Sequence, residues 1–258
     1  MDLKIRGKVA LVTAASKGLG KAVATALADD GAKVYICSRN RERIEAARDE
    51  IIRETCGEVI AFAFDITDEK AVAEAIDSIG KIDILYCNAG GPPTGLAENF
   101  VLQDYRDALE LNLLSIVMLC NLTLPLMKQQ HWGRIIINTS VSAKQPIDNL
   151  ILSNTARSGV LGFMKSLSNE VAEFGITVNA VCPGFTQTER IKKLAEGFVK
   201  AGKGSISDFY NTIENQVPAK RLGTLEEYGS TVAFLSSVSA AYITGVSLPI
   251  DGGFIKGL

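Results

Sequence analysis

Short apolar runs recur along the chain, and helix-like segments separate most of them. The runs are rich in β-branched residues and nearly continuous, which is typical of strands buried on both faces of a sheet. Strands that alternate with helices predict a parallel sheet with right-handed crossovers and helices on both faces. The expected fold is therefore a Rossmann-type, doubly wound α/β sheet of about seven strands. The predicted strands are Val9–Val12, Val34–Ile36, Val59–Phe64, Ile82–Cys87, Ile135–Asn138, Ile176–Val181 and Val246–Ile250.

Turn and helix-cap residues between these runs support the same organisation. Thr224-Leu225-Glu226-Glu227 is a capping box, which predicts a last helix over residues 224 to 237. Residues 184 to 216 form the least regular stretch, and we expect an inserted substrate loop with a short helix there. A glycine can close a helix in the left-handed conformation just before a strand. The predicted glycine caps are Gly31, Gly57, Gly80, Gly133 and Gly175.

Length and charge narrow the classes of protein. A chain of 258 residues without a linker or repeat fits one domain spanning residues 1–258. Its net charge of −2 gives no sign of a nucleic-acid-binding surface. The richest apolar stretch, Leu113–Met127, is interrupted by polar residues and Pro125, and the first residues lack a signal-peptide pattern. We therefore expect a cytoplasmic protein with no membrane or nucleic-acid partner.

Cysteine usage is consistent with that compartment. The number of cysteines is odd, and none forms a Cys-x-x-Cys pair. A disulfide framework or a zinc site is not expected, and no other cluster of His, Cys, Asp and Glu suggests a metal. The five cysteines are Cys37, Cys56, Cys87, Cys120 and Cys182.

A glycine-containing turn follows the first predicted strand and leads into a helix. Gly18 and Gly20 would let the backbone approach a phosphate, and the helix N-terminus would offer free N–H groups to it. An ordinary tight turn is the alternative interpretation of so short a pattern. The segment reads Thr13-Ala14-Ala15-Ser16-Lys17-Gly18-Leu19-Gly20.

The end of the second predicted strand bears on the choice of cofactor. An acidic residue there would bind the ribose hydroxyls of NAD, but this chain has Ser38-Arg39. A guanidinium at Arg39 and the ammonium of Lys17 suit the 2′-phosphate of NADP. Both could instead be plain surface cations. On the charge argument NADP is favoured over NAD.

Several segments, including the glycine turn, follow one another along the chain in the order found in a known family. They are Thr13–Gly20, Phe64-Asp65-Ile66-Thr67, Cys87-Asn88-Ala89-Gly90, Glu110-Leu111-Asn112-Leu113, Ser140 after Asn138-Thr139, Cys182-Pro183-Gly184-Phe185-Thr186-Gln187-Thr188, and Asp251-Gly252-Gly253. In these positions the chain resembles the short-chain dehydrogenase/reductase family, although Ala14 stands where the family has a glycine. The resemblance implies a hydride-transferring oxidoreductase similar to 3-oxoacyl reductases and to sugar or alcohol dehydrogenases. It also implies a homotetramer or homodimer.

The resemblance assigns roles to individual residues. Asn112 and Ser140 match catalytic positions, and Ser153 and Arg157 stand where the family has its catalytic tyrosine and lysine. Asp65 would lie near the adenine, Asn88 and Gly90 near a ribose, and Thr186 and Thr188 near the carboxamide. The full set of predicted cofactor contacts is Thr13, Ser16, Lys17, Gly18, Leu19, Gly20, Ser38, Arg39, Asp65, Ile66, Asn88, Ala89, Gly90, Arg157, Pro183, Gly184, Thr186 and Thr188.

The family's Tyr-x-x-x-Lys pair is absent. No tyrosine of this chain has a lysine four residues later, and the local sequence is Leu152-Ser153-Asn154-Thr155-Ala156-Arg157. A serine hydroxyl has a far higher pKa than a phenol, and an arginine stays charged at ordinary pH. Arg157 could still bind ribose hydroxyls, but neither residue replaces the family's proton relay.

Three interpretations remain open at this stage. The chain could be a reductase or dehydrogenase whose proton comes from Ser140, from a water beside Ser153, from Lys144 or from Tyr210. It could bind NADP without a redox step, as a regulatory or partner subunit. It could also carry out another reaction, with Arg157 holding an anionic substrate such as a carboxylate. His131, the single histidine, is interpreted as a cap or surface residue.

Overall fold

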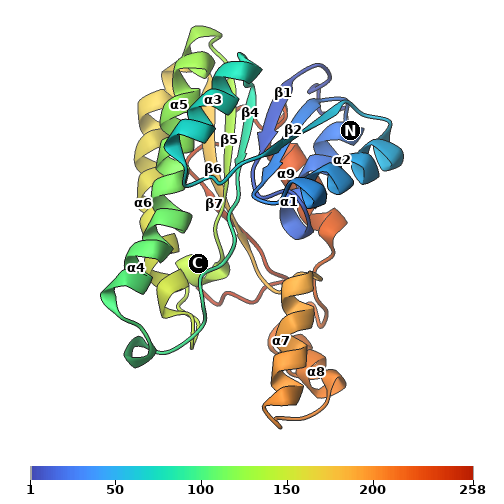
Figure 1. Ribbon diagram of the computed structural model, residues 1–258, viewed down its shortest axis with the longest axis vertical. Coiled ribbons are helices and arrows are strands. Elements are labelled where there is room, and N and C mark those ends of the chain that lie inside the picture. The colour runs from blue at the N-terminus through green and yellow to red at the C-terminus, as the bar shows by residue number, and fades with distance from the viewer. Residues whose placement is uncertain (1, 258) are drawn as a thin grey trace.

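The predicted parallel sheet is present in the computed structural model, which describes residues 2–257 (Figure 1). Its strand order within those residues is β3-β2-β1-β4-β5-β6-β7, and every neighbouring pair is parallel. All seven predicted strands are confirmed, with ends that differ by a few residues. The strands are β1 (Val9–Val12), β2 (Lys33–Ser38), β3 (Val59–Ala63), β4 (Ile84–Cys87), β5 (Gly133–Asn138), β6 (Ile176–Pro183) and β7 (Ser247–Ile250).

Helices cover both faces of this sheet (Figure 1). One buried cluster joins the sheet to α1, α2 and α9, with Leu27, Ile44 and Val232 as members. A second cluster joins the other face to α3, α5 and α6. The helices are α1 (Gly18–Asp29), α2 (Arg41–Thr55), α3 (Glu69–Ile79), α4 (Leu102–Leu109), α5 (Ser115–Gln129), α6 (Ile151–Val171), α7 (Glu189–Lys200), α8 (Ile206–Gln216) and α9 (Leu225–Leu235).

The strand order reverses between β1 and β4. The chain runs outward from β1 through β2 to β3, and then crosses back to β4 on the other side of β1. The loops that follow β1 and β4 therefore leave in opposite directions and open a crevice at the carboxyl ends of the strands. This edge of the sheet is where a ligand of such a fold binds.

The glycine caps are confirmed at some positions and wrong at others. Gly31, Gly80 and Gly175 have positive φ, as a left-handed helix end requires. Gly57 and Gly133 do not, and Cys56 and His131 take the left-handed conformation instead. At Gly133 a side chain has no room, because an added Cβ would lie 2.6 Å from Met127 Sδ. At this position packing rather than conformation requires the glycine.

The insert is more regular than expected. Residues 184 to 216 hold two helices, α7 and α8, rather than one short helix, and they project from the body of the molecule (Figure 1). Thr188 caps the first helix, and Ser205 and Asp208 form a capping box at the second. Ile191, Ile213, Val217 and Leu222 form a small buried cluster of their own. The projection is thus a packed unit attached to the sheet.

A π-helical turn, η2 (Glu110–Leu114), interrupts the helix between α4 and α5. The whole run Leu102–Gln129 is long and apolar enough to cross a membrane by length and composition alone. Its residues Ile116, Leu119 and Met127 are buried in the second core cluster against the sheet. Such packing is typical of a core helix. Single π turns of this kind often lie at functional sites.

Candidate functional site

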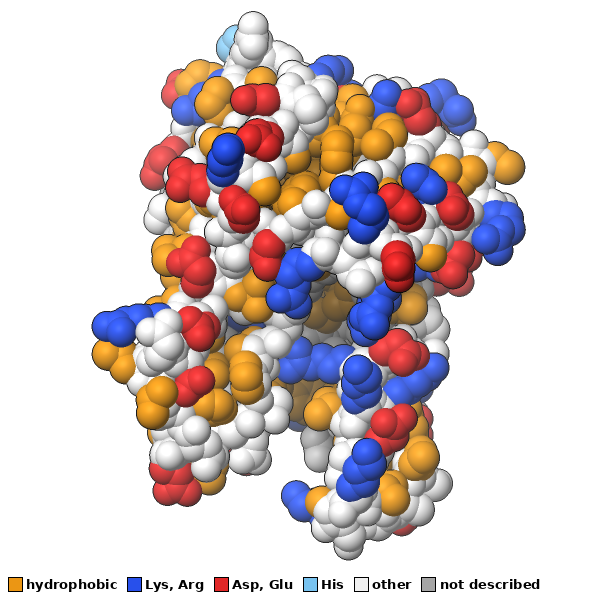
Figure 2. All heavy atoms as spheres, viewed as in Figure 1, with side chains coloured by type: hydrophobic (Ala, Val, Ile, Leu, Met, Phe, Trp, Pro, Cys, Tyr) orange, Lys and Arg blue, Asp and Glu red, His pale blue; other side chains and the backbone are white. Residues whose placement is uncertain are grey.

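A cavity of about 600 Å³ opens at the carboxyl ends of the strands, where the strand order reverses. The loops after β1, β2, β4, β5 and β6 all contribute to its walls, together with α6 and the start of α7. Figure 2 shows the molecule hollowed between the α7–α8 projection and the body, with Lys and Arg side chains along the hollow. The sequence thus predicted the location of the site.

The glycine turn after β1 leads directly into α1, as the sequence predicted. Gly18 has φ +58°, and a Cβ added at Gly20 would lie 2.5 Å from the carbonyl oxygen of Ala14. Each glycine is therefore required, the first by conformation and the second by close approach. Ala14 itself has φ +47°, a left-handed conformation that costs about 1–2 kcal/mol for a residue with a Cβ. The departure from the family pattern is thus accommodated with strain.

One end of the cavity is cationic. Arg39 lines it and is 79% exposed, and its Nη1 lies 3.9 Å from Asp65 Oδ2. Asp65 is held by Thr67, whose backbone N–H and hydroxyl donate to Asp65 Oδ1 at 3.1 and 2.9 Å. Arg43, in the first turn of α2, also lines the cavity. Arg43 was not among the residues predicted from the sequence, although it belongs to the same short basic segment as Arg39.

A buried hydrogen-bond network supports the side of the cavity that contains the glycine turn. Asn138 Nδ2 donates to Asn88 Oδ1 at 2.7 Å, and Tyr228 Oη donates to Asn138 Oδ1 at 2.9 Å. Tyr86 Oη lies 2.9 Å from Tyr228 Oη. Thr13 Oγ1 donates to the Asn88 carbonyl at 2.7 Å and accepts from its N–H at 2.8 Å. Burial raises the pKa of both phenols, so they stay protonated and available as donors.

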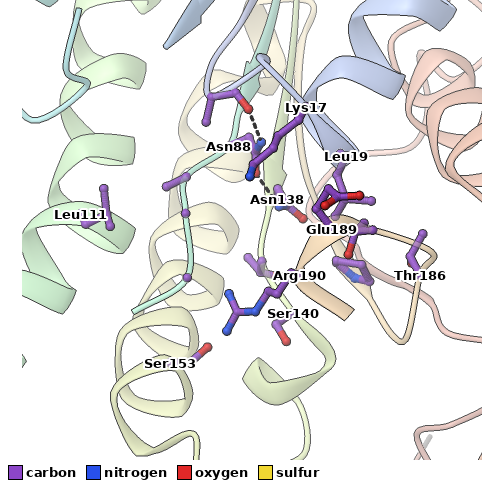
Figure 3. Close-up of a pocket in the computed structure, with 18 of the residues that line it drawn as sticks. Lys17, Leu19, Asn88, Leu111, Asn138, Ser140, Ser153, Thr186, Glu189 and Arg190 are labelled. Atoms are coloured by element: carbon purple, nitrogen blue, oxygen red, sulfur yellow. Dashed lines mark hydrogen bonds between the residues drawn. The ribbon is translucent and has the colours of Figure 1, made fainter. Parts of the chain in front are cut away.

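Three serine hydroxyls lie at the other end of the cavity. Ser140 and Ser153 both line it (Figure 3). Ser140 Oγ accepts from the N–H of Ser142 at 3.1 Å and caps the short helix η3 (Val141–Ala143). Ser153 Oγ lies 3.3 Å from Ser142 Oγ. Ser142 was not among the predicted residues, and it pairs with Ser153.

Arg157 is buried and bonded to backbone oxygens. Its Nη1 donates to the carbonyls of Asn138 at 3.1 Å and Thr139 at 2.9 Å, and so ties α6 to the end of β5. Burial, together with the nearby charge of Arg190, lowers its pKa to about 10. The guanidinium is therefore charged at neutral pH and lies in the cavity wall.

A second arginine, Arg190, enters the same end of the cavity. It stands in the first turn of α7, and Figure 3 shows its guanidinium between Ser140 and Ser153. A Cβ added at Gly91 would lie 1.6 Å from Arg190 Nη1, so this side chain packs on the loop after β4. Arg190 was not among the residues predicted from the sequence. Its residue type, six positions after Gly184, carries no local signal for this placement.

Asn112 lies behind the cavity wall. Its side chain is fully buried in the π turn, and neither Nδ2 nor Oδ1 has a hydrogen-bond partner within the described chain. Its neighbour Leu111 lines the cavity in its place. Of the other candidate proton donors, Lys144 donates to the Ser247 carbonyl at 3.1 Å, and Tyr210 packs in the α7–α8 cluster. Neither is part of the cavity lining, which corrects that expectation.

Most of the predicted site residues meet in one place. Thr13 and Gly20 lie beneath the cavity floor, where they hold Asn88 and allow the close turn. No group of three or more His, Cys, Asp or Glu within residues 2–257 has the arrangement of a metal site. The predicted residues that line the cavity are Ser16, Lys17, Gly18, Leu19, Ser38, Arg39, Asp65, Ile66, Asn88, Ala89, Gly90, Ser140, Ser153, Arg157, Pro183, Gly184, Thr186 and Thr188.

Comparison with known proteins gives one family throughout. A family model described as short chain dehydrogenase matches residues 8–197. The chain is 36% identical over 255 residues to the 3-oxoacyl-[acyl-carrier-protein] reductase of Escherichia coli (strain K12), covering 97% of this chain and 98% of that one. It is 31% identical to an NADPH-dependent reductase of Bacillus subtilis (strain 168), over 97% and 99% of the two chains.

Solved structures agree with this result. The structure of L-sorbose reductase from Gluconobacter frateurii, complexed with NADPH and L-sorbose, superposes with a TM-score of 0.95 at 30% identity. The match covers 100% of both chains. The likeness therefore includes the α7–α8 projection as well as the sheet.

Proposed function

Because the chain belongs to the short-chain dehydrogenase family, we propose that it is an NADP-dependent reductase of carbonyl compounds with an altered reacting end. NADP is the cofactor to which the compared reductases point. The observation that carries the proposal is the cavity itself, which joins a cationic end at Arg39 to a hydroxyl-lined end at Ser153. The cationic end would bind the phosphates of a dinucleotide, and the hydroxyl-lined end would bind a small carbonyl compound.

The residues of the cavity fit this cofactor. Gly18 and Gly20 allow the backbone N–H groups at the start of α1 to approach the pyrophosphate. Arg39 and Arg43 would hold the 2′-phosphate, and Lys17 would add positive charge. Asp65, oriented by Thr67, would bind the adenine end. Thr186 and Thr188 would lie near the carboxamide.

At the reacting end the chain's own groups orient the carbonyl compound. NADPH, when bound, supplies the hydride. The hydroxyls of Ser140 and Ser153 would donate hydrogen bonds to the carbonyl oxygen, and the charge of Arg157 would stabilise negative charge that develops there. No side chain at this end has the tuned phenol of the family, so the proton would come from water. We therefore expect slower turnover than with a positioned acid, which is worth about 10²–10⁴-fold.

The experiment that tests this proposal is titration of the purified protein with NADPH and with NADH. A panel of carbonyl compounds is then monitored for oxidation of the cofactor. Tight binding of NADPH with turnover is expected. Binding without turnover on any member of the panel favours the alternative of a non-catalytic NADP-binding subunit. No binding of either nucleotide would overturn the proposal.

The α7–α8 projection serves as the substrate lid in this proposal. Ile191 and Leu194 of α7 line the cavity, so movement of the projection would open or close the reacting end. The two helices share their own apolar cluster, which lets them move as a unit. A lid of this kind would also limit the access of water.

We further propose a homodimer or homotetramer. Large apolar side chains at the start of α4 and in η2 are exposed in the single chain, with exposed fractions of 69% at Val101, 64% at Leu102 and 49% at Leu114. Burial of such side chains between copies would be favourable. Light scattering should give a mass of two or four chains, and Leu114→Glu should lower it. A wild-type mass of one chain would contradict the proposal.

A further inference from the structure

We propose that Arg190 binds a carboxylate of the substrate, so that this reductase acts on oxo acids with an apolar body. The inference rests on the proposed function and specifies the substrate class of the same site. It is carried by the position, the unpaired charge and the surroundings of this one side chain.

Arg190 is placed to meet a ligand rather than to stabilise the fold. Its guanidinium lies in the cavity between Ser140 and Ser153, where a substrate carbonyl would bind (Figure 3). Within residues 2–257 it takes part in no ion pair. The adjacent carboxylate, Glu189, pairs instead with Lys192 at 3.1 Å. The donors of Arg190 are thus free to bind an anion.

Arg157 and Arg190 both line the reacting end, and the adjacent carboxylate in the lining, Glu189, is paired with Lys192. The charge of Arg190 contributes to lowering the pKa of Arg157. The two hydrogen bonds of Arg157 Nη1 go to neutral carbonyls. Two like charges in a partly enclosed cavity are costly unless an anion binds beside them. An anionic substrate would relieve that cost, which a neutral ketone cannot do.

The residues that line the cavity around Arg190 indicate the chemistry of the rest of the substrate. The side chains of Val141, Ile147, Leu150, Ile191 and Leu194 form an apolar wall at this end. A carboxylate has two oxygens, which one guanidinium fork can satisfy with two parallel hydrogen bonds. The apolar wall would then contact a hydrocarbon body, with the carbonyl between the anion and that body.

The position of Arg190 depends on the absence of a side chain at Gly91. Its Nη1 occupies the space that a Cβ of residue 91 would need, at 1.6 Å. Gly91→Ala therefore displaces the guanidinium but keeps its charge on the molecule. This substitution distinguishes a positioned carboxylate ligand from a general attraction of anions.

The test compares a carboxylate with its uncharged ester. The probes are 4-methyl-2-oxopentanoate and its methyl ester, titrated calorimetrically into protein saturated with NADP⁺, which cannot reduce them. We expect the acid to bind about ten- to hundredfold more tightly than the ester, as for a charge-assisted bidentate pair. Arg190→Gln should reduce this ratio to about one, and Gly91→Ala should lower it toward the same value.

The matched control is Lys193→Gln, which removes one positive charge from the exposed side of the same helix. It should leave the ratio unchanged. An acid that binds no more tightly than its ester, or a preference that persists in Arg190→Gln, would overturn the inference. A loss of NADP⁺ affinity in Arg190→Gln would also overturn it, because Arg190 would then be a cofactor ligand.

Failure of the proposed function gives a different result. The NADP⁺ titration of the wild-type protein reports on cofactor binding alone. The acid and the ester are also titrated into cofactor-free protein, so that absence of NADP⁺ binding does not conceal the anion preference. Retained preference without NADP⁺ binding would support Arg190 as a carboxylate ligand and reject the reductase.

Discussion

The two ends of the cavity are built in different ways. The proposed cofactor end is fixed by short, buried hydrogen bonds through Thr13, Asn88 and Asn138. The proposed reacting end holds a long Ser142–Ser153 contact of 3.3 Å and an arginine without an ion-pair partner in the described chain. The two ends therefore differ in how far their polar groups are already bonded within the chain.

The hydrogen bonds at the end of β5 show why residues at one end of the cavity can be replaced without effect on the other end. Asn138 and Arg157 both meet the end of β5, but through different atoms. The Asn138 side chain joins the network toward Tyr228 and the cofactor end, whereas its carbonyl accepts from Arg157 at the reacting end. A substitution at Arg157 would therefore alter the reacting end without removing a member of the network.

The largest expected effect comes from restoring the family pair at the reacting end. Ser153→Tyr combined with Arg157→Lys would supply a phenol that a neighbouring cation can tune. If the rest of the cavity is conventional, turnover of simple ketones should rise by about 10²–10⁴-fold. Steady-state kinetics with NADPH measures this.

The single variant Arg157→Lys is the control for that experiment. Arg157→Lys alone removes the Nη1 that donates to the carbonyls of Asn138 and Thr139, supplies no phenol, and should not raise turnover. An unchanged or lower rate in the double variant would show that the reacting end is specialised for another substrate class. The carboxylate preference proposed for Arg190 is one such specialisation.

The next effect tests the network at the cofactor end. Asn138→Leu would leave Tyr228 Oη without its acceptor and Asn88 Oδ1 without its donor, both buried. We expect a loss of about 2–4 kcal/mol in the free energy of unfolding, measured in urea. NADPH affinity should fall as well, since Asn88 lines the cavity.

Asn112→Leu is the matched comparison, because it is the same substitution at another fully buried asparagine. The Asn112 amide makes no hydrogen bond within the described chain, so its removal breaks none. The free energy of unfolding should stay the same or rise slightly. Equal losses in the two variants would show that the network contributes nothing beyond side-chain packing.

Local patterns in the sequence predicted much of this molecule. Continuous apolar runs predicted the strands, and the glycine turn and Arg39 predicted residues that line one end of the cavity. Each of these predictions depends on neighbours in the chain. Tyr228 meets Asn138 across a separation of 90 residues, and no local pattern reports such a contact. The same is true of Arg190 on Gly91. The helix α8 is different, since the Ser205–Asp208 capping box was a signal that the sequence offered.

A smaller effect concerns selectivity at the cofactor end. Arg39→Asp replaces the guanidinium with a carboxylate beside Asp65, which lies 3.9 Å from it at present. NADPH affinity should fall about ten- to hundredfold relative to NADH, because a 2′-phosphate would meet negative charge. Lys203→Asp, on the exposed turn between α7 and α8, controls for charge reversal alone. Equal losses for NADPH and NADH would remove Arg39 from the 2′-phosphate.

The smallest effect lies at the base of the lid, outside both ends of the cavity. Two hydrogen bonds from Arg221, at 2.6 and 2.8 Å, lower the pKa of Glu227 from 4.5 to about 2, with help from the backbone N–H of Thr224. A carboxyl whose pKa is lower in the folded state stabilises that state above the unfolded pKa, and the contribution disappears as the pH falls. The melting temperature of wild-type protein should therefore exceed that of Glu227→Gln by a constant amount above pH 4.5. The difference should close between pH 4.5 and about 2. A difference that persists at pH 2 would mean that Glu227 stabilises the lid through its neutral hydrogen bonds rather than through its charge.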